Sequence, residues 1–168
     1  SILRIDDMSG AGLQIYTPGT GTLDAPGDIA IDSPGRIYVA SAFTDSILRI
    51  DDMTGAGLVT YSPGVATLDG PQGIAVDSLG RIYIASAGTD SILRIDDMSG
   101  AGLVTYSPGA ATLDAPFGLS LDSAGRIYVA SGGNDSLLRI DDMTGAGLTI
   151  YQPGPAILDG PADVLTPF

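Results

Sequence analysis

Short apolar runs separated by turns rich in glycine, proline and aspartate make up the whole chain. The stretch from Leu68 to Ser86, LDGPQGIAVDSLGRIYIAS, has one run on each side of an Asp-Ser-Leu-Gly turn. Two runs rich in β-branched residues around a glycine turn predict a β-hairpin. A second pair of runs, SILRIDD and GLVTYS, flanks another glycine turn and predicts a second hairpin. We therefore predict an all-β fold, with strands near 27–32, 36–41, 46–52 and 57–62.

This pattern repeats every 45 residues. Equivalent units begin at Ser1, Ser46, Ser91 and Ser136, so the repeats are 1–45, 46–90, 91–135 and an incomplete 136–168. Four short strands in a unit of about 40–50 residues are typical of a β-propeller blade. The sequence therefore predicts one domain over residues 1–168, a propeller or partial propeller whose chain starts and ends inside a blade.

The motif of the first hairpin has a Pro-x-Gly start, an apolar run and the sequence D-S-x-G-R-I-Y, and it resembles the NHL repeat. The resemblance covers essentially the whole chain. In the second repeat the matching positions are Pro71, Gly73, Asp77, Gly80, Arg81 and Tyr83. The resemblance implies a propeller, typically six-bladed, that binds proteins, RNA or small ligands. Enzymes of related shape are lyases or lactonases that use His, Glu or a bound metal. The first repeat departs from the pattern, with Gly27-Asp28 in place of x-Gly.

Several residue types that catalysis commonly needs are missing. The sequence has no Cys, His, Trp, Lys or Glu. This excludes a Ser-His-Asp triad, a Cys nucleophile, a His-ligated zinc or iron site and a haem ligand. We therefore predict that the protein is not an enzyme and uses no cofactor or metal. An enzyme that relies on aspartates alone, with or without Ca²⁺, is the least favoured alternative.

The chain is strongly acidic, with a net charge of −13 at pH 7, and its seven Arg are evenly spaced. This charge opposes binding to nucleic acid and to anionic membranes, and it favours solubility. No run approaches the roughly 20 apolar residues that span a membrane, so we predict no membrane insertion. The missing His, Lys and Cys suit an extracellular or cell-surface location. Without a signal peptide or an initial Met, we expect a mature, processed or partial chain.

Two charged positions recur within the apolar pattern. One Arg lies in the SILRI-like run that opens each repeat, at Arg4, Arg49, Arg94 and Arg139. A cation inside an apolar layer needs a partner. The nearest supply is the Asp that ends the first predicted strand of each blade, at Asp32, Asp77 and Asp122. We predict a repeated Arg–Asp pair between these two sets.

The turn DDMSGAG or DDMTGAG recurs in every repeat. Asp7 before Ser9-Gly10 predicts an Asx turn, in which glycines supply positive φ. Paired aspartates also suggest calcium, but the alternating oxygen ligands and terminal Glu of an EF-hand loop are absent. We therefore interpret the motif as a turn that Ca²⁺ stabilises little. One Tyr per repeat follows the turn, and we predict that it packs between blades: Tyr16, Tyr61, Tyr106 and Tyr151.

Differences between the repeats gather in two places. One is the step before the innermost strand, and the other is the loop between the second and third strands of a blade. Both places lie at the same end of a blade, so they surround one mouth of the channel, where loops carry recognition. We predict that a protein or small ligand docks there, on Phe43, Asp45, Gln72, Asp90, Phe117, Asn134 and Asp135. Drift at tolerant loop positions after duplication is the alternative explanation.

The function that these observations favour is a non-catalytic binding or interaction scaffold. The alternative is a structural element in which incomplete blades drive assembly into a ring or a filament. Residues 1–17 would supply the two outer strands of one blade, and Asp163–Leu165 one innermost strand. Bare blade faces seek partners, so we expect association with further copies of the chain or with a missing part of the parent protein. A lone chain that closes as a four-bladed ring is the less favoured outcome.

Overall fold

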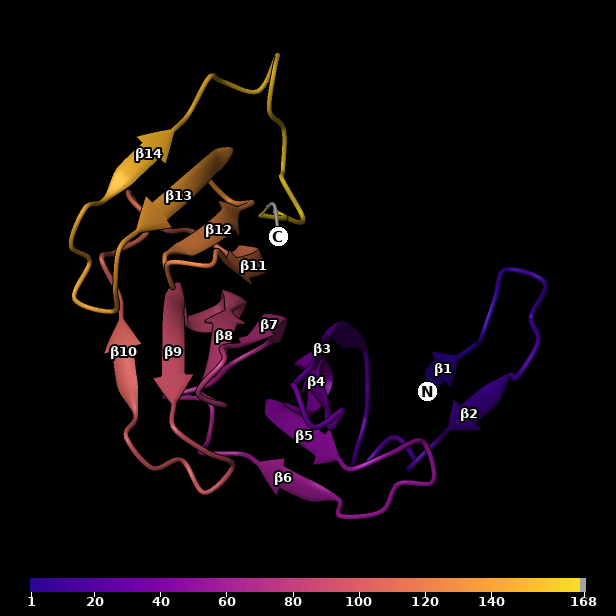
Figure 1. Cartoon of the computed structure of the whole chain (residues 1–168). Coiled ribbons are helices and arrows are strands. Elements are labelled where there is room, and N and C mark those ends of the chain that lie inside the picture. Colours follow the sequence, from indigo (N-terminus) through magenta and orange to yellow (C-terminus); the bar gives the residue numbers. More distant parts are fainter. Residues whose placement is uncertain (167–168) are drawn as a thin grey trace.

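The protein is built from β-strands joined by turns, as the computed structural model of residues 1–166 shows (Figure 1). Its strands form three four-stranded antiparallel sheets and one two-stranded sheet. Two 3₁₀ turns, η1 (Ala42–Thr44) and η2 (Ala87–Thr89), are three residues long, and no helix within residues 1–166 is long and apolar enough to cross a membrane. The all-β prediction is confirmed.

Strands that follow one another in the sequence are neighbours in each sheet. The two-stranded sheet consists of β1 (Ile2–Arg4) and β2 (Gln14–Tyr16). The full sheets contain β3 (Pro26–Ile31), β4 (Ile37–Ser41), β5 (Ser46–Ile50) and β6 (Val59–Tyr61), then β7 (Pro71–Val76), β8 (Ile82–Ser86), β9 (Ser91–Ile95) and β10 (Val104–Tyr106), then β11 (Pro116–Leu121), β12 (Ile127–Ser131), β13 (Ser136–Ile140) and β14 (Thr149–Tyr151). The predicted spans match β3 to β6 to within two residues at each end.

The sheets stand side by side as blades around a common axis (Figure 1). The first strand of each full blade, β3, β7 or β11, lies innermost, and the fourth, β6, β10 or β14, lies outermost. Among the innermost strands, which surround the axis, β7 contacts β3 on one side and β11 on the other. The blades do not close into a ring: a wide gap separates the β1–β2 sheet from the last blade (Figure 1).

The hydrophobic core lies in layers between consecutive blades. Tyr38 and Ile47 of the first full blade are buried together with Ile84 and Leu93 of the second. The second and third full blades form an equivalent layer, and so do the β1–β2 sheet and the first full blade. Because an inner blade is covered on both faces, its strands are near-continuous apolar runs. The main contacts of each blade are with its neighbours, as in other repeat architectures.

A tyrosine on the outer strand joins each blade to the next one. The ring of Tyr16 lies directly against Gly55, where a Cβ would collide with it. Tyr61 lies in the same way on Gly100, and Tyr106 lies on Gly145. These glycines have φ near 82°, in the left-handed region that the turn requires. The predicted packing of these three tyrosines between blades is confirmed.

The recurring aspartate of the first strand pairs with a different arginine from the one predicted. Asp32, Asp77 and Asp122 bind Arg36, Arg81 and Arg126 at 2.6–2.7 Å. The predicted partners Arg4, Arg49, Arg94 and Arg139 instead approach Asp6, Asp51, Asp96 and Asp141 at 3.3–3.6 Å. The prediction is wrong because the hairpin turn already brings the nearer Arg into reach. In that turn the aspartate also accepts the backbone N–H of the Arg, four residues on, at 2.8–3.0 Å.

The predicted Asx turns are confirmed in all four copies. The carboxylate of Asp7 accepts the backbone N–H of Ser9 at 2.9 Å, and Gly10 has φ 84°. Asp52, Asp97 and Asp142 make the same bond at 2.8 Å. Hydrogen bonds from the Ser or Thr side chain and backbone lower the pKa of each of these carboxyls. Among residues 1–166, no three carboxylates come together as a metal site.

The innermost strand predicted at Asp163–Leu165 does not form. This segment runs past β11 at Gly118 and is held by the Thr166 hydroxyl, which donates to the Leu121 carbonyl at 2.8 Å. A strand needs a partner for its backbone N–H and C=O groups. Within residues 1–166 no second strand pairs with the segment, so it stays irregular.

Candidate ligand site at the axis of the blades

Each innermost strand begins with a β-bulge. In the ladder between β3 and β4, Pro26 pairs with Ser41 and Asp28 with Ala40, so Gly27 has no partner. The ladder of β7 shifts in the same way at Gln72. In β11 the shift lies between Pro116 and Leu119 and includes Phe117. A bulge changes the direction of the side chain that it carries, and these bulges sit at the end of the blade nearest the axis.

The bulges surround one cavity of about 240 Å³. Its lining residues come from the starts of β3, β7 and β11 and from the segment after β14: Gly27, Asp28, Gln72, Phe117, Gly118, Ala162 and Asp163. Four of these positions, 27, 72, 117 and 162, are equivalent in the four repeats and carry four different residues. The cavity therefore lies where the repeats differ from one another. We call it the axial cavity.

Phe117 is fitted into the blade that carries it. A Cβ on Gly132 would lie 2.5 Å from two atoms of the Phe117 ring, so only glycine leaves room for the ring there. The other repeats have alanine at this position, Ala42 and Ala87, together with the smaller Gly27 and Gln72. The large side chain and the missing methyl group thus occur in the same repeat.

Asp28 is the most buried charged group of the axial cavity. One carboxylate oxygen accepts the backbone N–H of Ile29 at 2.7 Å, and the other accepts that of Ile74, in the next blade, at 3.0 Å. Burial raises the pKa of Asp28, and the negative charge of Asp163 adds to this rise against the lowering effect of the two N–H groups. A positively charged ligand in the cavity would offset that unfavourable environment.

The predicted site residues fall into three groups. Gln72 and Phe117 line the axial cavity. Phe43 lies in η1 outside it, with 76% of its surface exposed. The other four are tied to backbone groups or neighbouring side chains. The Asp45, Asp90 and Asp135 carboxylates accept the N–H of Gly70, Ala115 and Gly160 at 2.8–2.9 Å, and the Asn134 side chain accepts the Ser136 hydroxyl at 2.6 Å.

Two cavity residues, Asp28 and Asp163, were not among the predicted site residues. They stand where the two middle repeats have Gly73 and Gly118. A carboxylate that replaces a glycine of the repeat pattern is the signal that points to them. Close approach of the next segment explains the glycines, because a Cβ on Gly73 would collide with the Phe117 carbonyl and one on Gly118 would lie 2.5 Å from Asp163 Cα.

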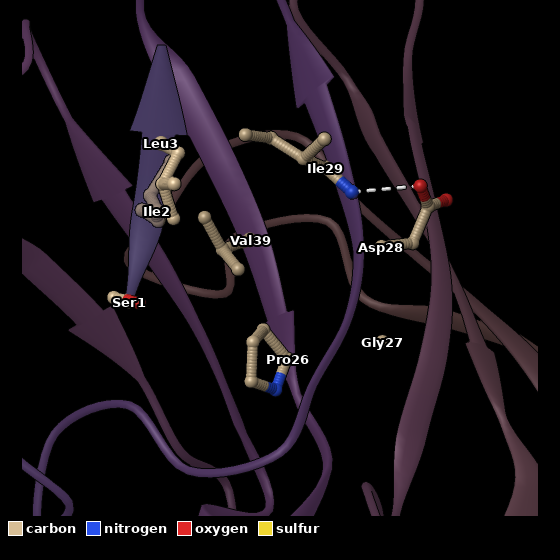
Figure 2. Close-up of a pocket in the computed structure, with 8 residues that line it drawn as sticks. All are labelled: Ser1, Ile2, Leu3, Pro26, Gly27, Asp28, Ile29 and Val39. Atoms are coloured by element: carbon tan, nitrogen blue, oxygen red, sulfur yellow. Dashed lines mark hydrogen bonds between the residues drawn. The ribbon is translucent and has the colours of Figure 1, made fainter. Parts of the chain in front are cut away.

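A second opening lies between the β1–β2 sheet and the first full blade (Figure 2). It measures about 220 Å³ and is lined by Ser1, Ile2, Leu3, Pro26, Gly27, Asp28, Ile29 and Val39. Ile29 is 46% exposed here, whereas the equivalent Ile74 and Leu119 are buried by the blade in front of them. We call this opening the β1–β3 slot. Its apolar lining residues are Ile2, Leu3, Pro26, Ile29 and Val39.

The opposite end of the blades carries a wider hollow of about 790 Å³, which includes Leu79, Ser120, Leu121 and Leu165. Its charged residues are Asp77, Arg81 and Asp122. These residues already belong to the Asp–Arg pairs of the hairpin turns. The hollow therefore offers little unpaired charge to a ligand, and the axial cavity is the better candidate.

The fold is that of a β-propeller. A catalytically inactive variant of virginiamycin B lyase from Staphylococcus aureus, solved with quinupristin, matches with a TM-score of 0.70 and 23% identity over 92% of this chain and 49% of its own. A chain of the nidogen/laminin complex matches at 0.70 and 22% identity, over 90% of this chain and 57% of its own. The WD40 repeats of RRP9 match at 0.60 and 17% identity, over 74% and 36%.

At these identities the similarity shows the fold alone. The chain spans between 36% and 57% of the length of these three solved structures. No family profile matches the sequence, and no curated protein matches it. The neighbours include a lyase and a chain of a protein complex, so a propeller of this shape serves both catalysis and protein binding in other proteins.

Proposed function

We propose that the chain is a non-catalytic binding scaffold that holds its ligand at the axial cavity. One observation carries the proposal: the bulges direct the residues that differ between near-identical repeats, among them Gln72 and Phe117, into one cavity. Drift would place differences without regard to the axis. The fit between Phe117 and Gly132 also speaks against drift, because two linked changes are needed to seat one ring.

The chemistry of the cavity favours a positively charged ligand, either a basic side chain of a protein or a small amine. Asp28 and Asp163 supply carboxylates, and Gln72 supplies an amide. An aromatic side chain such as Phe117 beside carboxylates suits a cation, because the ring face is electron-rich. The net charge of −13 draws cations towards the whole molecule and repels nucleic acid.

Catalysis is disfavoured by the residues present. The chain has no His, Cys, Glu or Lys, and the neighbouring lyase was inactivated by replacing a histidine. Asp28 is a poor general base because both of its oxygens already accept backbone N–H groups. The remaining carboxylates mostly recur in every repeat, where they stabilise turns.

We further propose that the blades are of the NHL type and that the protein works outside the cell or at its surface. The first part is supported by the shared contacts of the motif residues Asp77, Arg81 and Tyr83, since the Asp77 carboxylate accepts from both other side chains. The second part rests on the absence of His, Lys and Cys. Fractionation of the source cells with an antibody to the chain would test the location.

The binding proposal is tested by fluorescence anisotropy with a lysine-rich and a glutamate-rich peptide of equal length. We expect the basic peptide to bind and the acidic one not to bind. Phe117→Ser should weaken binding by roughly tenfold, because it removes an aromatic contact worth about 1–2 kcal/mol. Leu79→Ser, at an apolar position on the opposite end that is as exposed as Phe43, is the control and should leave binding unchanged.

Phe43→Ser decides how far the site extends, since Phe43 was predicted to contact the ligand but lies outside the cavity. A loss equal to that of Phe117→Ser would extend the site to η1. The proposal would be wrong if the two peptides bound alike, or if Leu79→Ser weakened binding as much as Phe117→Ser. Melting temperatures of all three variants separate lost binding from lost folding.

A further inference from the structure

The open row of blades has an uncovered face at each end. The face of the β1–β2 sheet, which we call the first face, exposes apolar positions that are buried everywhere else in the chain. Leu3, Ile5 and Met8 of the β1–β2 sheet are 60%, 43% and 95% exposed. One repeat later the equivalent residues are 1%, 1% and 9% exposed, and later repeats are similar: Leu48, Ile50 and Met53, then Leu93, Ile95 and Met98, then Leu138, Ile140 and Met143. Within residues 1–166 no blade covers this first face. Gly10 belongs to it and has no other atom within 4 Å of its Cβ position.

The uncovered face of the β11–β14 blade and of the segment after it, which we call the last face, exposes the complementary positions. Tyr151 is 58% exposed, whereas the three equivalent tyrosines lie on a glycine of the next blade. Leu137 is partly exposed, whereas the equivalent Ile47 and Ile92 are fully buried. Leu165 is 84% exposed and stands at the repeat position of Ala30, which packs into the next layer. Each end thus exposes one half of a blade-to-blade contact, and the two halves are complementary.

We propose that the last face of one copy packs on the first face of a second copy, repeating the contact between consecutive blades. In this junction the Tyr151 ring lies on Gly10 of the partner, as Tyr106 lies on Gly145. Leu137 covers the Leu3 and Ile5 side, and Leu165 enters the β1–β3 slot against Ile29 (Figure 2). The proposed junction is apolar against apolar, which fits two chains of equal charge. It does not depend on the ligand proposed above.

Two such junctions close a ring of two chains. The chain fits a propeller at a TM-score of 0.70 over 92% of its own length but only 49% of the other chain. The tilt between its blades therefore follows that of a propeller about twice as long, and two copies supply that length. A chain closed on itself would bring Tyr151 onto Gly10, and no such contact exists. In the closed ring the axial cavities of the two copies face each other across one channel, so each copy supplies half of its wall.

Light scattering coupled to size exclusion tests the junction at micromolar concentration. We expect the wild-type chain at twice its mass of 17.0 kDa. Leu3→Asp should place a charge in the first face and weaken association roughly 30-fold or more, as loss of an interface hot spot does. Tyr151→Asp should do the same from the last face. Val65→Asp, at a site 59% exposed in the connection between the first and second full blades, is the matched control and should stay at twice the mass.

Mixing the two variants gives a test that misfolding cannot imitate. The Leu3→Asp chain keeps an intact last face, and the Tyr151→Asp chain keeps an intact first face. An equimolar mixture therefore contains one intact junction per pair and should regain association. Wild type at the mass of one chain, variants that associate like wild type, or a mixture that stays monomeric would overturn the proposed junction. A mass that keeps rising with concentration would overturn the closed ring, because an open head-to-tail contact gives filaments.

Discussion

The ring of Phe117 fills the space that a methyl group on residue 132 would occupy. Glycine stands at 132 only in the repeat that carries this ring, while Ala42 and Ala87 stand at the same position in the other repeats. Phe117 lies in β11, and Gly132 is the turn residue directly after β12 of the same blade. The size of one is therefore matched to the size of the other.

This match predicts a non-additive pair of substitutions. Gly132→Ala should lower the free energy of unfolding by about 1–3 kcal/mol, because the added methyl group overpacks the ring. In the double variant Phe117→Gln with Gly132→Ala, the pair becomes that of Gln72 and Ala87, and most of the loss should disappear. Urea denaturation of the two single variants and the double variant measures the coupling. Simple addition of the two single effects would contradict the match.

The Asp77–Arg81 pair should contribute more to stability than the Asp51–Arg49 pair. Asp77 is largely buried and accepts four hydrogen bonds, from the backbone of Leu79 and from Arg81 and Tyr83. Asp77→Ala leaves these donors without a partner and should cost about 2–3 kcal/mol. Asp51→Ala breaks a contact of 3.5 Å at the surface and should cost less than about 1 kcal/mol. Equal losses of unfolding free energy in a denaturant titration would argue against a structural role of the Asp77–Arg81 pair.

Acid should unfold the protein by protonating the aspartates of the Asp–Arg pairs in the hairpin turns. Burial alone would raise the pKa of Asp32 and Asp77, but the hydrogen bonds from Arg36 and Arg81 outweigh it, so each pKa lies below its ordinary value of 3.8. A carboxyl with a lowered pKa stabilises the fold above pH 3.8, and this contribution is lost as the pH falls through the folded pKa. Melting temperatures should therefore fall steeply below that pH. A melting temperature that stays flat down to pH 2 would contradict this assignment.

Asp28 should show the opposite pH dependence. Its pKa is raised by burial, so at neutral pH its charge works against the fold. Asp28→Asn removes the charge and keeps one oxygen for the Ile74 N–H, so the variant should melt at a higher temperature at pH 7. The gain should vanish as the pH falls through the raised pKa, because wild-type Asp28 is then neutral too. The same substitution should weaken the binding of a cationic ligand. A variant with a lower melting temperature at pH 7 would show that the charge is needed for folding.

Self-association should strengthen with salt. Each chain carries a net charge of −13, so two copies repel one another, while the proposed junction is apolar. Salt screens repulsion over the Debye length, which shrinks from about 30 Å at 0.01 M to about 10 Å at 0.1 M. Sedimentation velocity at these two ionic strengths should show more dimer at the higher one. Dissociation by salt would instead indicate a junction held by ion pairs.

Local spacing was enough to predict the strands and turns, because each depends on residues near one another in the sequence. The runs around the turn at Asp77 give both strands of a hairpin, and Asp7 before Ser9-Gly10 gives an Asx turn. The partner of Asp77 was not predictable in this way. Arg94 was predicted as a partner because it lies inside an apolar run, but the backbone path of the turn brings the Arg81 guanidinium to Asp77, and Arg94 approaches Asp96 instead.

The axial cavity was predictable only in part, because a bulge leaves no mark in a hydrophobic pattern. Variation between repeats identified Gln72 and Phe117, which the bulges turn towards the axis. The same loops placed Asp90 and Asn134 in the prediction, but the Asp90 carboxylate accepts the N–H of Ala115 and the Asn134 side chain accepts the Ser136 hydroxyl. Asp28 was visible as a departure from the repeat pattern, yet its burial and its bond to the next blade come from the approach of two strands 45 residues apart.

The repeated tyrosine–glycine joint has a consequence for how the chain reaches its native state. Tyr16, Tyr61 and Tyr106 would each fit any of the equivalent glycines, so a blade can dock in a register that is wrong by one whole repeat. Such a slip keeps nearly every native contact, and it would be a deep kinetic trap. The bond from the Ile74 N–H to Asp28 joins two blades and occurs once, so it distinguishes correct from slipped docking. Asp28→Gly, which erases this difference, should slow refolding more than it changes equilibrium stability.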